Sequence, residues 1–339
     1  MAKGGTGLSA TPQIALVGCG YWGKNLCRNF HALGALSTVI DATENGQATA
    51  RSIAPDIQVT DGLDDVLRND QIQGIALATP AETHAELAIQ AMQAGKDVFV
   101  EKPMALTLGD AEKMKKVAEG TGRILMVGHL LEYHPAVLKL REMIASGQLG
   151  KINYIYSNRL NFGKVRTEEN ALWSFAPHDV AVILRLMGQE PVEVSACGGS
   201  YLTHGIADTT LSNLSFENES RAHIFVSWLH PFKEQRLVVV GDKKMAIFND
   251  VAPFEEKVQV YPQNVEFDGP IPILKKDDAE FVEHANTEPL REECNHFLDC
   301  IQSRKQPLTN AQSGIDVLKV LHACQQSIEQ NGVPISLRN

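Results

Sequence analysis

Short apolar runs alternate with segments of helical periodicity along the first third of the chain. The apolar runs, which we interpret as strands, are Ile14–Val17, Ser37–Ile40, Ile75–Ala78, Val98–Val100 and Ile124–Val127. The helical segments between them are Asn25–Leu33, Ala48–Ile53, Leu63–Leu67, Thr83–Ala94 and Leu108–Ala118. Strands that alternate with helices usually pair in parallel, and the helices cover both faces of the sheet. The pattern therefore predicts an α/β domain with a parallel, doubly wound sheet.

Beyond residue 150 the pattern changes to strand after strand, separated by short turns. The expected strands are Ile152–Ser157, Val192–Ala196, Thr209–Phe216, Ala222–Trp228, Arg236–Val240, Met245–Phe248 and Lys257–Tyr261. The turn Gly241–Lys244 predicts a hairpin, and two helices, Leu290–Gln302 and Gln312–Gln330, close the chain. Consecutive strands joined by short turns favour an α+β domain with a largely antiparallel sheet.

These changes in pattern suggest where the domains begin and end. Residues 1–12 are rich in Gly, Ser and Thr and are expected to form a flexible tail. Residues 13–130 would form the first domain and residues 131–339 the second, with a helix around Ala136–Ser146 at the crossover. We leave open the alternative that the terminal helices pack back on the first domain.

The charge balance excludes some classes of partner. The chain has 41 acidic and 31 basic residues, which gives a net charge of −10. Nucleic acids and anionic membranes bind basic surfaces, so neither is expected as a partner. No apolar run approaches the roughly 20 residues of a membrane-spanning helix, and the N-terminus lacks the apolar stretch of a secretory signal.

The cysteines indicate a reducing compartment. None of the six forms a Cys-x-x-Cys pair, so we expect free thiols in a cytoplasmic protein. Cys294, His296 and Cys300 could suggest a metal site. However, Cys294 shares helical spacing with the apolar residues Phe297 and Ile301, so we expect a buried helix face there and no metal.

The first predicted strand runs directly into Gly18-Cys19-Gly20-Tyr21-Trp22-Gly23, which matches G-x-G-x-x-G. After a strand and before a helix, the first glycine permits a tight turn and the second lets the backbone approach a pyrophosphate. The third glycine, Gly23, lets the helix pack closely on the strand. The N-terminus of that helix attracts phosphate, so we expect the loop, including Tyr21 and Trp22, to bind a dinucleotide.

Asp41 ends the second predicted strand, at the place where a carboxylate accepts hydrogen bonds from the ribose of the adenosine. The same negative charge would repel a 2′-phosphate, and neither Ala42 nor Thr43 could bind one. The sequence therefore predicts NAD rather than NADP as the cofactor.

Polar residues also follow two later strands of the first domain. Thr79 and Pro80 follow one strand, and Glu101 and Lys102 follow the next, which Pro103 ends. In open parallel sheets, ligands bind outside the carboxyl ends of the strands. The further residues expected on the cofactor side are Thr79, Pro80, His84, Glu101 and Lys102.

Taken together, these motifs resemble a known family over nearly the whole chain. The segments that carry the resemblance are Gly18–Gly23, Asp41, Ala78-Thr79-Pro80, Ala94-Gly95-Lys96 and Glu101-Lys102-Pro103. They are similar to the glucose–fructose oxidoreductase/inositol dehydrogenase/MocA family of sugar and polyol dehydrogenases. The resemblance implies a Rossmann domain followed by a domain with an open antiparallel sheet. It also implies that the free face of this sheet forms the contact of a homo-oligomer, either a dimer or a tetramer. It also implies that Lys102 binds and polarises the reacting hydroxyl beside the nicotinamide.

The resemblance also implies a catalytic histidine in the second domain, at the start of a helix that ends in Leu-Met-Gly. His178 fits by its distance from Leu186–Gly188, with Pro177 near the expected helix start. Many relatives carry Asp four residues before the histidine, whereas this chain has Ser174 there and Asp179 directly after His178. Which of the two takes part in a proton relay is left open. Imidazole suits the role of base because it titrates near neutral pH.

Two local segments narrow the resemblance to nucleotide-sugar 3-dehydrogenases. They are Gly128–Pro135 and Arg159–Arg166. Both are similar to the UDP-N-acetylglucosamine 3-dehydrogenases of bacterial lipid A diamino-sugar synthesis, in which the 3-keto product passes to an aminotransferase.

The second segment concentrates positive charge in an acidic chain. Arg159, Lys164 and Arg166 fall within eight residues, which suits a diphosphate, although a solvated basic loop is an equal alternative. The residues expected to contact substrate are Lys102, Tyr133, His134, Arg159, Asn161, Lys164, Arg166, Asn170, Trp173, His178 and Asp179.

The sequence thus predicts NAD-dependent oxidation of the 3-hydroxyl of a UDP-sugar, foremost UDP-N-acetylglucosamine. The product would feed an aminotransferase in lipopolysaccharide and lipid A synthesis. One alternative is a UDP-N-acetylglucosaminuronate 3-dehydrogenase, which would need one more cation in its pocket. Another is an inositol or aldose dehydrogenase, which would need no diphosphate site. An inactive NAD-binding regulator is a third, against which Lys102 and His178 both count.

Overall fold

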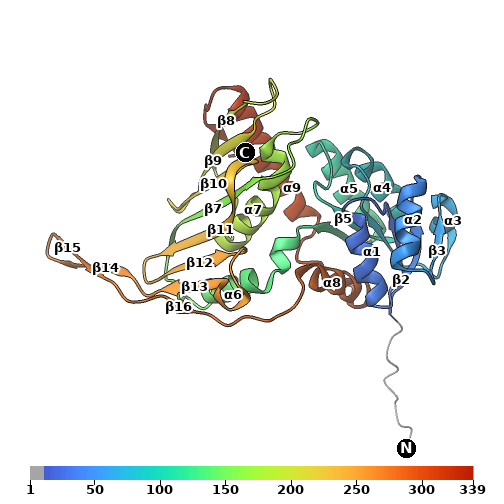
Figure 1. Ribbon diagram of the computed structural model, residues 1–339, viewed down its shortest axis with the longest axis horizontal. Helices are drawn as coiled ribbons and strands as arrows, with labels where there is room; N and C mark the ends of the chain where they lie inside the picture. Colours follow the sequence, from blue (N-terminus) through green and yellow to red (C-terminus); the bar gives the residue numbers. More distant parts are fainter. Residues whose placement is uncertain (1–10, 339) are drawn as a thin grey trace, which may run out of the picture. The chain divides into compact units, whose positions relative to one another are not determined.

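The computed structural model describes residues 11–338, so most of the tail expected over residues 1–12 lies outside the described residues. Figure 1 shows the course of the chain. It divides into two compact units. The first unit extends to Gly128 and also contains Leu290–Ile315, and the second contains His129–Pro289 and the chain from Asp316 onward.

The first unit is built on a six-stranded parallel sheet with the strand order β3-β2-β1-β4-β5-β6. The strands are β1 (Ile14–Val17), β2 (Leu36–Ile40), β3 (Gln58–Thr60), β4 (Gly74–Leu77), β5 (Asp97–Glu101) and β6 (Leu125–Gly128). The predicted parallel α/β sheet is therefore confirmed. Only β3 was not expected from the sequence, because it is three residues long and none of them is buried.

Helices connect these strands, and a helix from the end of the chain joins them. The connecting helices are α1 (Gly23–Ala32), α2 (Glu44–Ile53), α3 (Leu63–Arg68), the 3₁₀ turn η1 (Ala81–Thr83), α4 (His84–Gln93) and α5 (Leu108–Thr121). Helix α8 (Pro289–Ser303) packs on the same unit through Phe297, whose ring meets Phe30 of α1 and Phe99 of β5 edge to face. A Cβ atom on Gly74 would lie 2.9 Å from Ile301 Cδ1, so this glycine lets α8 approach β4 closely.

The second unit contains a nine-stranded sheet with the order β16-β13-β12-β11-β7-β10-β9-β8-β17. Its strands are β7 (Ile152–Phe162), β8 (Glu193–Gly199), β9 (Thr209–Ser215), β10 (Arg221–Ser227), β11 (Leu229–Gly241), β12 (Met245–Asn249), β13 (Val258–Tyr261), β16 (Glu280–Phe281) and β17 (Ile335–Ser336). Strands β7 and β10 pair in parallel, whereas the other pairs of this sheet are antiparallel. The largely antiparallel sheet is confirmed, with β7 and β11 several residues longer than expected.

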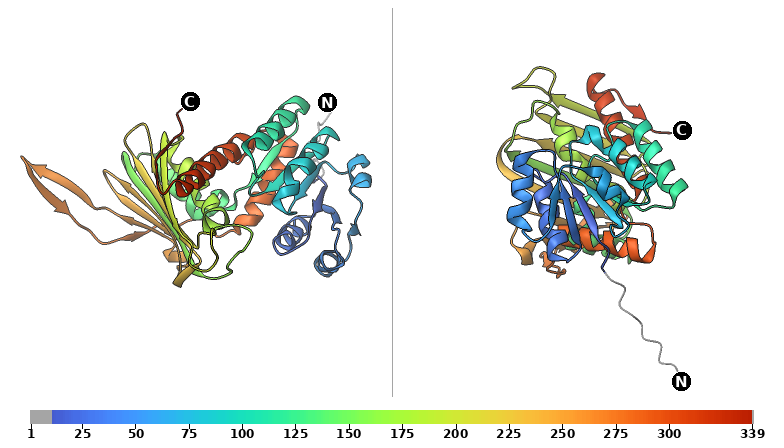
Figure 2. Two further views of the ribbon diagram at one scale, coloured as in Figure 1. Left: turned by 90° about the horizontal axis from the view of Figure 1, so that it is seen from above. Right: turned by 90° about the vertical axis from the view of Figure 1, so that its right-hand side faces the viewer.

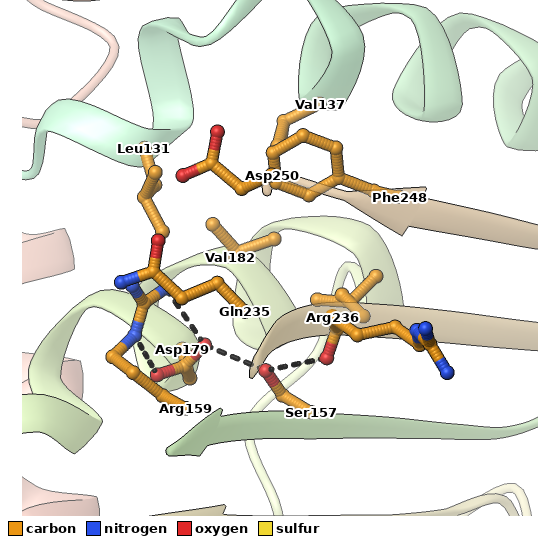
Figure 3. A pocket seen from close by; sticks show the side chains of 11 residues that line it. Leu131, Val137, Ser157, Arg159, Asp179, Val182, Gln235, Arg236, Phe248 and Asp250 are labelled. Carbon is orange, nitrogen blue, oxygen red and sulfur yellow. Dashed lines mark hydrogen bonds and ion pairs between the residues drawn. The ribbon is translucent and has the colours of Figure 1, made fainter. Parts of the chain in front are cut away.

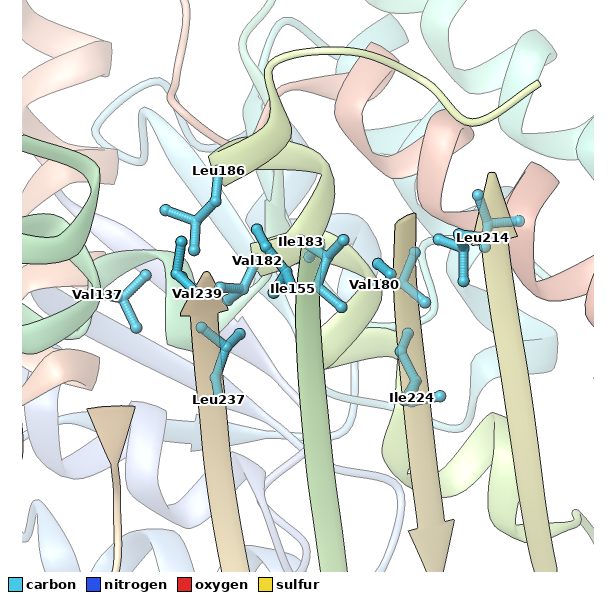
Figure 4. Close-up of a cluster of buried hydrophobic side chains, with 14 of the residues drawn as sticks. Val137, Ile155, Val180, Val182, Ile183, Leu186, Leu214, Ile224, Leu237 and Val239 are labelled. Atoms are coloured by element: carbon cyan, nitrogen blue, oxygen red, sulfur yellow. The ribbon is translucent and has the colours of Figure 1, made fainter. Parts of the chain in front are cut away.

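One face of this sheet forms the core of the second unit. The helical elements here are η2 (Leu130–Tyr133), α6 (Pro135–Ala145), α7 (Ala171–Met187), η3 (Phe254–Glu256) and α9 (Ala311–Glu329). Figure 4 shows Val180 and Ile183 of α7 above Ile155 of β7 and Ile224 of β10, all fully buried. Because side chains alternate along a strand, the other face carries a different set. On it, Leu211 of β9 is 38% exposed.

A hairpin extends beyond the edge of this sheet (Figures 1 and 2). It consists of β14 (Asn264–Asp268) and β15 (Ile271–Lys275), which pair only with each other among the described residues. Val265 lies opposite Leu274, and Phe267 lies opposite Pro272, so one face of the hairpin is apolar. Phe267 is 70% exposed. The sequence did not suggest this hairpin, because its short apolar runs are interrupted by prolines and charges.

Among residues 11–338, no helix combines the length and the apolar character needed to cross a membrane. In the same residues, no group of three or more His, Cys, Asp or Glu side chains is arranged to hold a metal ion.

Candidate active site

The glycine loop follows β1 and is held against the end of β4. Gly18 has a positive φ of 90°, and a Cβ atom there would lie 2.8 Å from the carbonyl oxygen of Ala78. A Cβ atom on Gly23 would collide with the carbonyl oxygen of Gly18. In contrast, nothing lies within 4 Å of the corresponding position on Gly20. The first and third glycines are thus required by packing, while the second leaves open space for an approaching pyrophosphate.

Asp41 lies directly after β2 and is nearly buried, with 9% of its surface exposed. Its carboxylate accepts hydrogen bonds from the backbone N–H of Cys19 at 2.7 Å and from the N–H and hydroxyl of Thr43 at 2.8 and 2.7 Å. Burial disfavours the charged form, but these donors outweigh it and lower the pKa of Asp41. The carboxylate is therefore ionised at neutral pH, as recognition of NAD against a 2′-phosphorylated dinucleotide requires. The ionised carboxylate of Asp41 and the open space at Gly20 thus fit the ribose and the pyrophosphate of NAD.

His84, expected on the cofactor side, is 1% exposed at the start of α4. Its Nδ1 lies 2.8 Å from the carbonyl oxygen of Pro103, and its Nε2 lies 2.9 Å from that of Thr79. Burial lowers the pKa of His84, and the neutral ring has one N–H, which can donate to one of these two carbonyl oxygens. His84 thus has a structural contact at the ends of β4 and β5, and its contact with a cofactor stays a prediction. The sequence could not indicate this, because both partners are backbone atoms of other segments.

The remaining cofactor candidates of the first unit lie along the same strand ends. Thr79 follows β4 and hydrogen-bonds the hydroxyl of Thr83 at 2.7 Å, and Pro80 precedes η1. Tyr21 is 84% exposed, and its ring lies under the ammonium of Lys24. Each stays a predicted cofactor contact.

Lys102 directly follows the last residue of β5, and its peptide bond to Pro103 is cis. The carboxylate of Glu101 accepts the backbone N–H of Lys102 at 3.3 Å and also the indole N–H of Trp22 from the glycine loop. The strand end that carries the lysine is thus linked to the loop that fits the dinucleotide.

His178 lies in the middle of α7 and not near its start. The helix begins at Ala171, with the side chain of Asn170 as its N-terminal cap, so Pro177 is inside the helix. The expectation that Pro177 marks the helix start is wrong, because the two preceding turns are rich in aromatic residues and were not recognised as helical. The helix ends as expected at Gly188, which has a positive φ of 66°.

Asp179 points away from solvent toward β7 (Figure 3). It is 2% exposed and accepts hydrogen bonds from the Ser157 hydroxyl at 2.6 Å and from Arg159 Nε and Nη2 at 2.7 and 3.1 Å. The guanidinium loses solvation on burial, but the adjacent carboxylate outweighs this and raises the pKa of Arg159. The guanidinium is thus charged, and it is paired with the carboxyl group of Asp179. The cavity they line holds only about 10 Å³, which is far too small for a sugar.

The ion pair between Arg159 and Asp179 separates Arg159 from the other two cations of the expected basic cluster. Arg159 lies inside the unit on β7, whereas Lys164 and Arg166 lie on the loop between β7 and α7. Lys164 is exposed, and Arg166 makes ion pairs with Glu169 at 3.3 Å and Glu168 at 3.9 Å. We expected Arg159 to contact a diphosphate, but its guanidinium is buried and paired with Asp179, which does not fit that role.

Several other predicted substrate residues have structural partners. Asn170 caps α7 and donates to Gln325 Oε1 at 2.9 Å, and the indole of Trp173 donates to the same oxygen at 3.3 Å. His134 caps α6 through Nδ1, and burial lowers its pKa to about 4. Tyr133 is 4% exposed, and Asn161 lies near the end of β7.

Sequence reasoning missed two contributors to this region. One is Gln325 of α9, which joins Asn170 and Trp173 across more than 150 residues of sequence. The other is an ion pair between the buried carboxyl group of Glu132 and the partly exposed Arg185 of α7. Burial raises the pKa of Glu132 to about 7 against the opposing effect of Arg185. No local pattern in the sequence marks either contact.

Comparison with known proteins gives a consistent result in both units. Residues 13–129 match the model of an oxidoreductase family with an NAD-binding Rossmann fold, and residues 137–247 match the GFO/IDH/MocA C-terminal domain. The UDP-N-acetylglucosamine 3-dehydrogenase of Acidithiobacillus ferrooxidans is 25% identical over 94% of this chain and 97% of its own length. A crystal structure of that enzyme has the same fold, with a TM-score of 0.83 at 23% identity over 94% of this chain and 97% of that one.

A second relative carries out a different reaction. The 2,7-anhydro-N-acetylneuraminate hydratase of Mediterraneibacter gnavus is 29% identical over 69% of this chain and 66% of its own length. The match thus spans just under two thirds of that relative. With both units matched by models of one family, the chain belongs to the GFO/IDH/MocA family of oxidoreductases with an NAD-binding Rossmann fold.

Proposed function

We propose that the chain oxidises the 3-hydroxyl of a UDP-sugar with NAD, and that the sugar is UDP-N-acetylglucosamine. One observation carries the proposal: the chain matches a UDP-N-acetylglucosamine 3-dehydrogenase over 94% of its length. Lys102 at the end of β5 and the glycine loop that fits a dinucleotide support it from within this chain.

The chemistry assigns one task to each proposed catalytic residue. NAD, when bound, supplies the acceptor for the hydride that leaves the carbon of the alcohol. Lys102 would donate a hydrogen bond to the hydroxyl oxygen and stabilise the negative charge that develops there. His178 would accept the hydroxyl proton, so that the C–O single bond becomes the carbonyl of a 3-keto sugar. Asp179 is paired with Arg159 and therefore supports helix α7 in this proposal, rather than relaying a proton from His178.

Recognition of the diphosphate would fall to Lys164 and Arg166. Their loop lies between β7 and α7, and the ion pairs of Arg166 are partly exposed to solvent. Such surface pairs contribute little, so a diphosphate can replace them at low cost. Arg159 cannot be displaced in the same way, because its release would leave Asp179 charged and buried.

The burial of Arg159 also favours a second candidate, an inositol or aldose dehydrogenase. With two loop cations instead of three, the argument for a diphosphate site is weaker. The hydratase relative indicates that membership of the family does not by itself determine which reaction a protein catalyses.

The product would be a ketone on a nucleotide sugar. A ketone condenses with an amine, so we propose that an aminotransferase consumes it in lipid A and lipopolysaccharide synthesis, in the cytoplasm.

We also propose that the chain forms a homo-oligomer, dimer or tetramer, through the open face of the nine-stranded sheet. Tyr154 of β7 and Leu211 of β9 are 40% and 38% exposed on this face, and Tyr156 stacks on His223 beside them. The apolar face of the β14–β15 hairpin adds a second uncovered surface, and an isolated two-stranded hairpin is marginal in water.

A screen of substrates with NAD tests the proposed reaction. We expect NADH absorbance to rise with UDP-N-acetylglucosamine, and far less with UDP-N-acetylglucosaminuronic acid, myo-inositol or glucose. Turnover of inositol or glucose alone would reject the nucleotide-sugar assignment. Turnover of none, with NAD bound normally, would favour a regulator.

Replacing either proposed catalytic residue should stop the reaction without unfolding the protein. We expect Lys102→Ala and His178→Ala to lower kcat by roughly 100-fold or more, since each removes a group that acts on the reacting proton or oxygen. NAD affinity, measured by calorimetry, should remain near that of the wild type. Lys113→Ala, which removes a lysine 70% exposed on α5, serves as the matched control. Near wild-type turnover in either variant would remove that residue from the mechanism.

Replacing the loop cations should affect substrate binding selectively. We expect Lys164→Ala with Arg166→Ala to raise KM for the UDP-sugar about tenfold or more, as loss of charge-assisted bonds implies, and to leave the melting temperature unchanged. The matched control is Lys113→Ala with Arg68→Ala, which removes the same charge from exposed sites of the first unit.

Arg159→Ala should behave in the opposite way, because it leaves the buried carboxylate of Asp179 unpaired. A cost of about 3–5 kcal/mol in the free energy of unfolding is expected, measured by urea denaturation. If Arg159→Ala raised KM without loss of stability, Arg159 would be a substrate contact after all.

Oligomer formation can be tested with two leucines of equal exposure. Leu211 lies on the open sheet face and Leu138 lies on α6, and both are 38% exposed. We expect light scattering to give a dimer or tetramer for the wild type and for Leu138→Glu, and a smaller species for Leu211→Glu. A monomeric wild type would contradict the proposal.

A further inference from the structure

Glu101 occupies a buried position where three segments of the first unit meet. It is the last residue of β5, is 8% exposed and pairs in register with Gly128 at the end of β6. A Cβ atom on Gly128 would lie 2.9 Å from Glu101 Oε2. The glycine therefore leaves the space that the carboxylate fills. This position is at the carboxyl edge of the sheet, where ligands of such sheets bind.

The carboxylate of Glu101 accepts hydrogen bonds from two segments, the glycine loop and the residue that follows β5. The indole N–H of Trp22 donates to Oε1, and the backbone N–H of Lys102 donates to Oε2 at 3.3 Å. Trp22 is the residue that precedes the first turn of α1, within the glycine loop. One carboxylate thus connects the loop that fits NAD with the residue proposed to polarise the substrate, across 79 residues of sequence.

We propose that Glu101 is a positioning residue that couples the occupied glycine loop to Lys102 through the indole of Trp22. The proposal rests on the role proposed above for Lys102. With a dinucleotide in the loop, the indole of Trp22 would keep its hydrogen bond to the carboxylate of Glu101, and the carboxylate would fix the backbone of Lys102 through its N–H. A displacement of about 1 Å in such a segment can cost 100-fold in rate, so a single contact of this kind is sufficient to matter.

The charge of Glu101 makes the coupling sensitive to pH. Burial raises the pKa of Glu101 to about 7, while the hydrogen bond from Trp22 and the charge of Lys102 oppose the rise. Lys102, the residue directly after β5, is the charged group that acts on the carboxylate, while Trp22 of the loop and Gly128 of β6 bring no charge. Above neutrality the ionised carboxylate accepts the indole N–H more strongly and attracts the positive charge of Lys102.

A titration without NAD tests the contact directly. The fluorescence of the wild type minus that of Trp22→Phe isolates the signal of Trp22, since the other two tryptophans remain in both. We expect this signal to change with a midpoint at a pH of about 7, set by Glu101. The signal of Trp22 is measured again as the fluorescence of Glu101→Gln minus that of the double variant Glu101→Gln with Trp22→Phe. We expect this signal not to change around pH 7. A Trp22 signal that does not titrate, or that still titrates without the carboxylate, would overturn the proposal.

Kinetics and NAD binding then separate positioning from a merely structural role. We expect Trp22→Phe to lower kcat roughly tenfold or more and to move the acid limb of its pH profile to higher pH, because it removes a donor that favours ionised Glu101. NAD affinity, measured by calorimetry, should depend on pH in the wild type and become independent of it in Glu101→Gln. Wild-type kcat with an unshifted profile in Trp22→Phe would reject the positioning role.

Trp228→Phe is the matched control for Trp22→Phe, because it also removes an indole N–H that donates to a carboxylate. The indole of Trp228 also donates to a carboxylate, Asp208 Oδ1 at 2.6 Å, but it lies in the core of the second unit. We expect this variant to melt at a lower temperature while its pH profile and NAD affinity stay unchanged. If it shifted the profile as Trp22→Phe does, the effect would be general destabilisation. The titration and NAD binding need no sugar, so they test the contact between Trp22 and Glu101 even if the UDP-sugar assignment fails.

Discussion

Backbone segments of the first unit approach one another so closely at two glycines that a methyl group has no room. Gly18 lies against the carbonyl of Ala78, and Gly23 lies against the carbonyl of Gly18. This contact fixes the loop between the ends of β1 and β4, and with it the point where α1 begins. The direction of Trp22 follows from that starting point, and so does the reach of its indole to Glu101. The cofactor loop and the lysine strand are therefore parts of one packed structure.

Buried carboxylates in this chain show how differently one functional group can be used. Asp41 receives three donors from Cys19 and Thr43, and its pKa falls. Asp179 is paired with an arginine and a hydroxyl, which stabilises helix α7 on the sheet. The pKa of Glu132 rises to about 7 although Arg185 is beside it, so a raised pKa does not by itself identify a functional group. What distinguishes Glu101 is that its partners belong to two elements with proposed functions.

Much of the first unit could be predicted from the sequence because its signals are local. A glycine pattern between a strand and a helix, or a proline after a charged pair, specifies its geometry within a few residues. The buried strands were identified for the same reason, while β3 was missed because its three residues are not buried. Family resemblance rather than spacing supplied the roles of Lys102 and His178.

Partners that are distant in sequence could not be predicted. Three cations within eight residues suggested one cluster, but pleating of β7 and the position of Asp179 turned Arg159 inward and left Lys164 on the loop. Asn170 and Trp173 looked available for a sugar until Gln325 of α9 proved to join them. In each case, only the tertiary fold decides which polar group finds a partner.

The return of α8 has a consequence for how the chain acquires its structure. Phe297 completes an aromatic cluster with Phe30 and Phe99, yet it is separated from them by the whole of His129–Pro289. The larger part of the second unit is thus inserted between two segments of the first, and the rest of it follows Ile315. During synthesis, the N-terminal segment leaves the ribosome long before the helix that seals its core, although domains generally fold in order of emergence. Part of the apolar surface of the first unit therefore stays uncovered until the chain beyond Pro289 has been made.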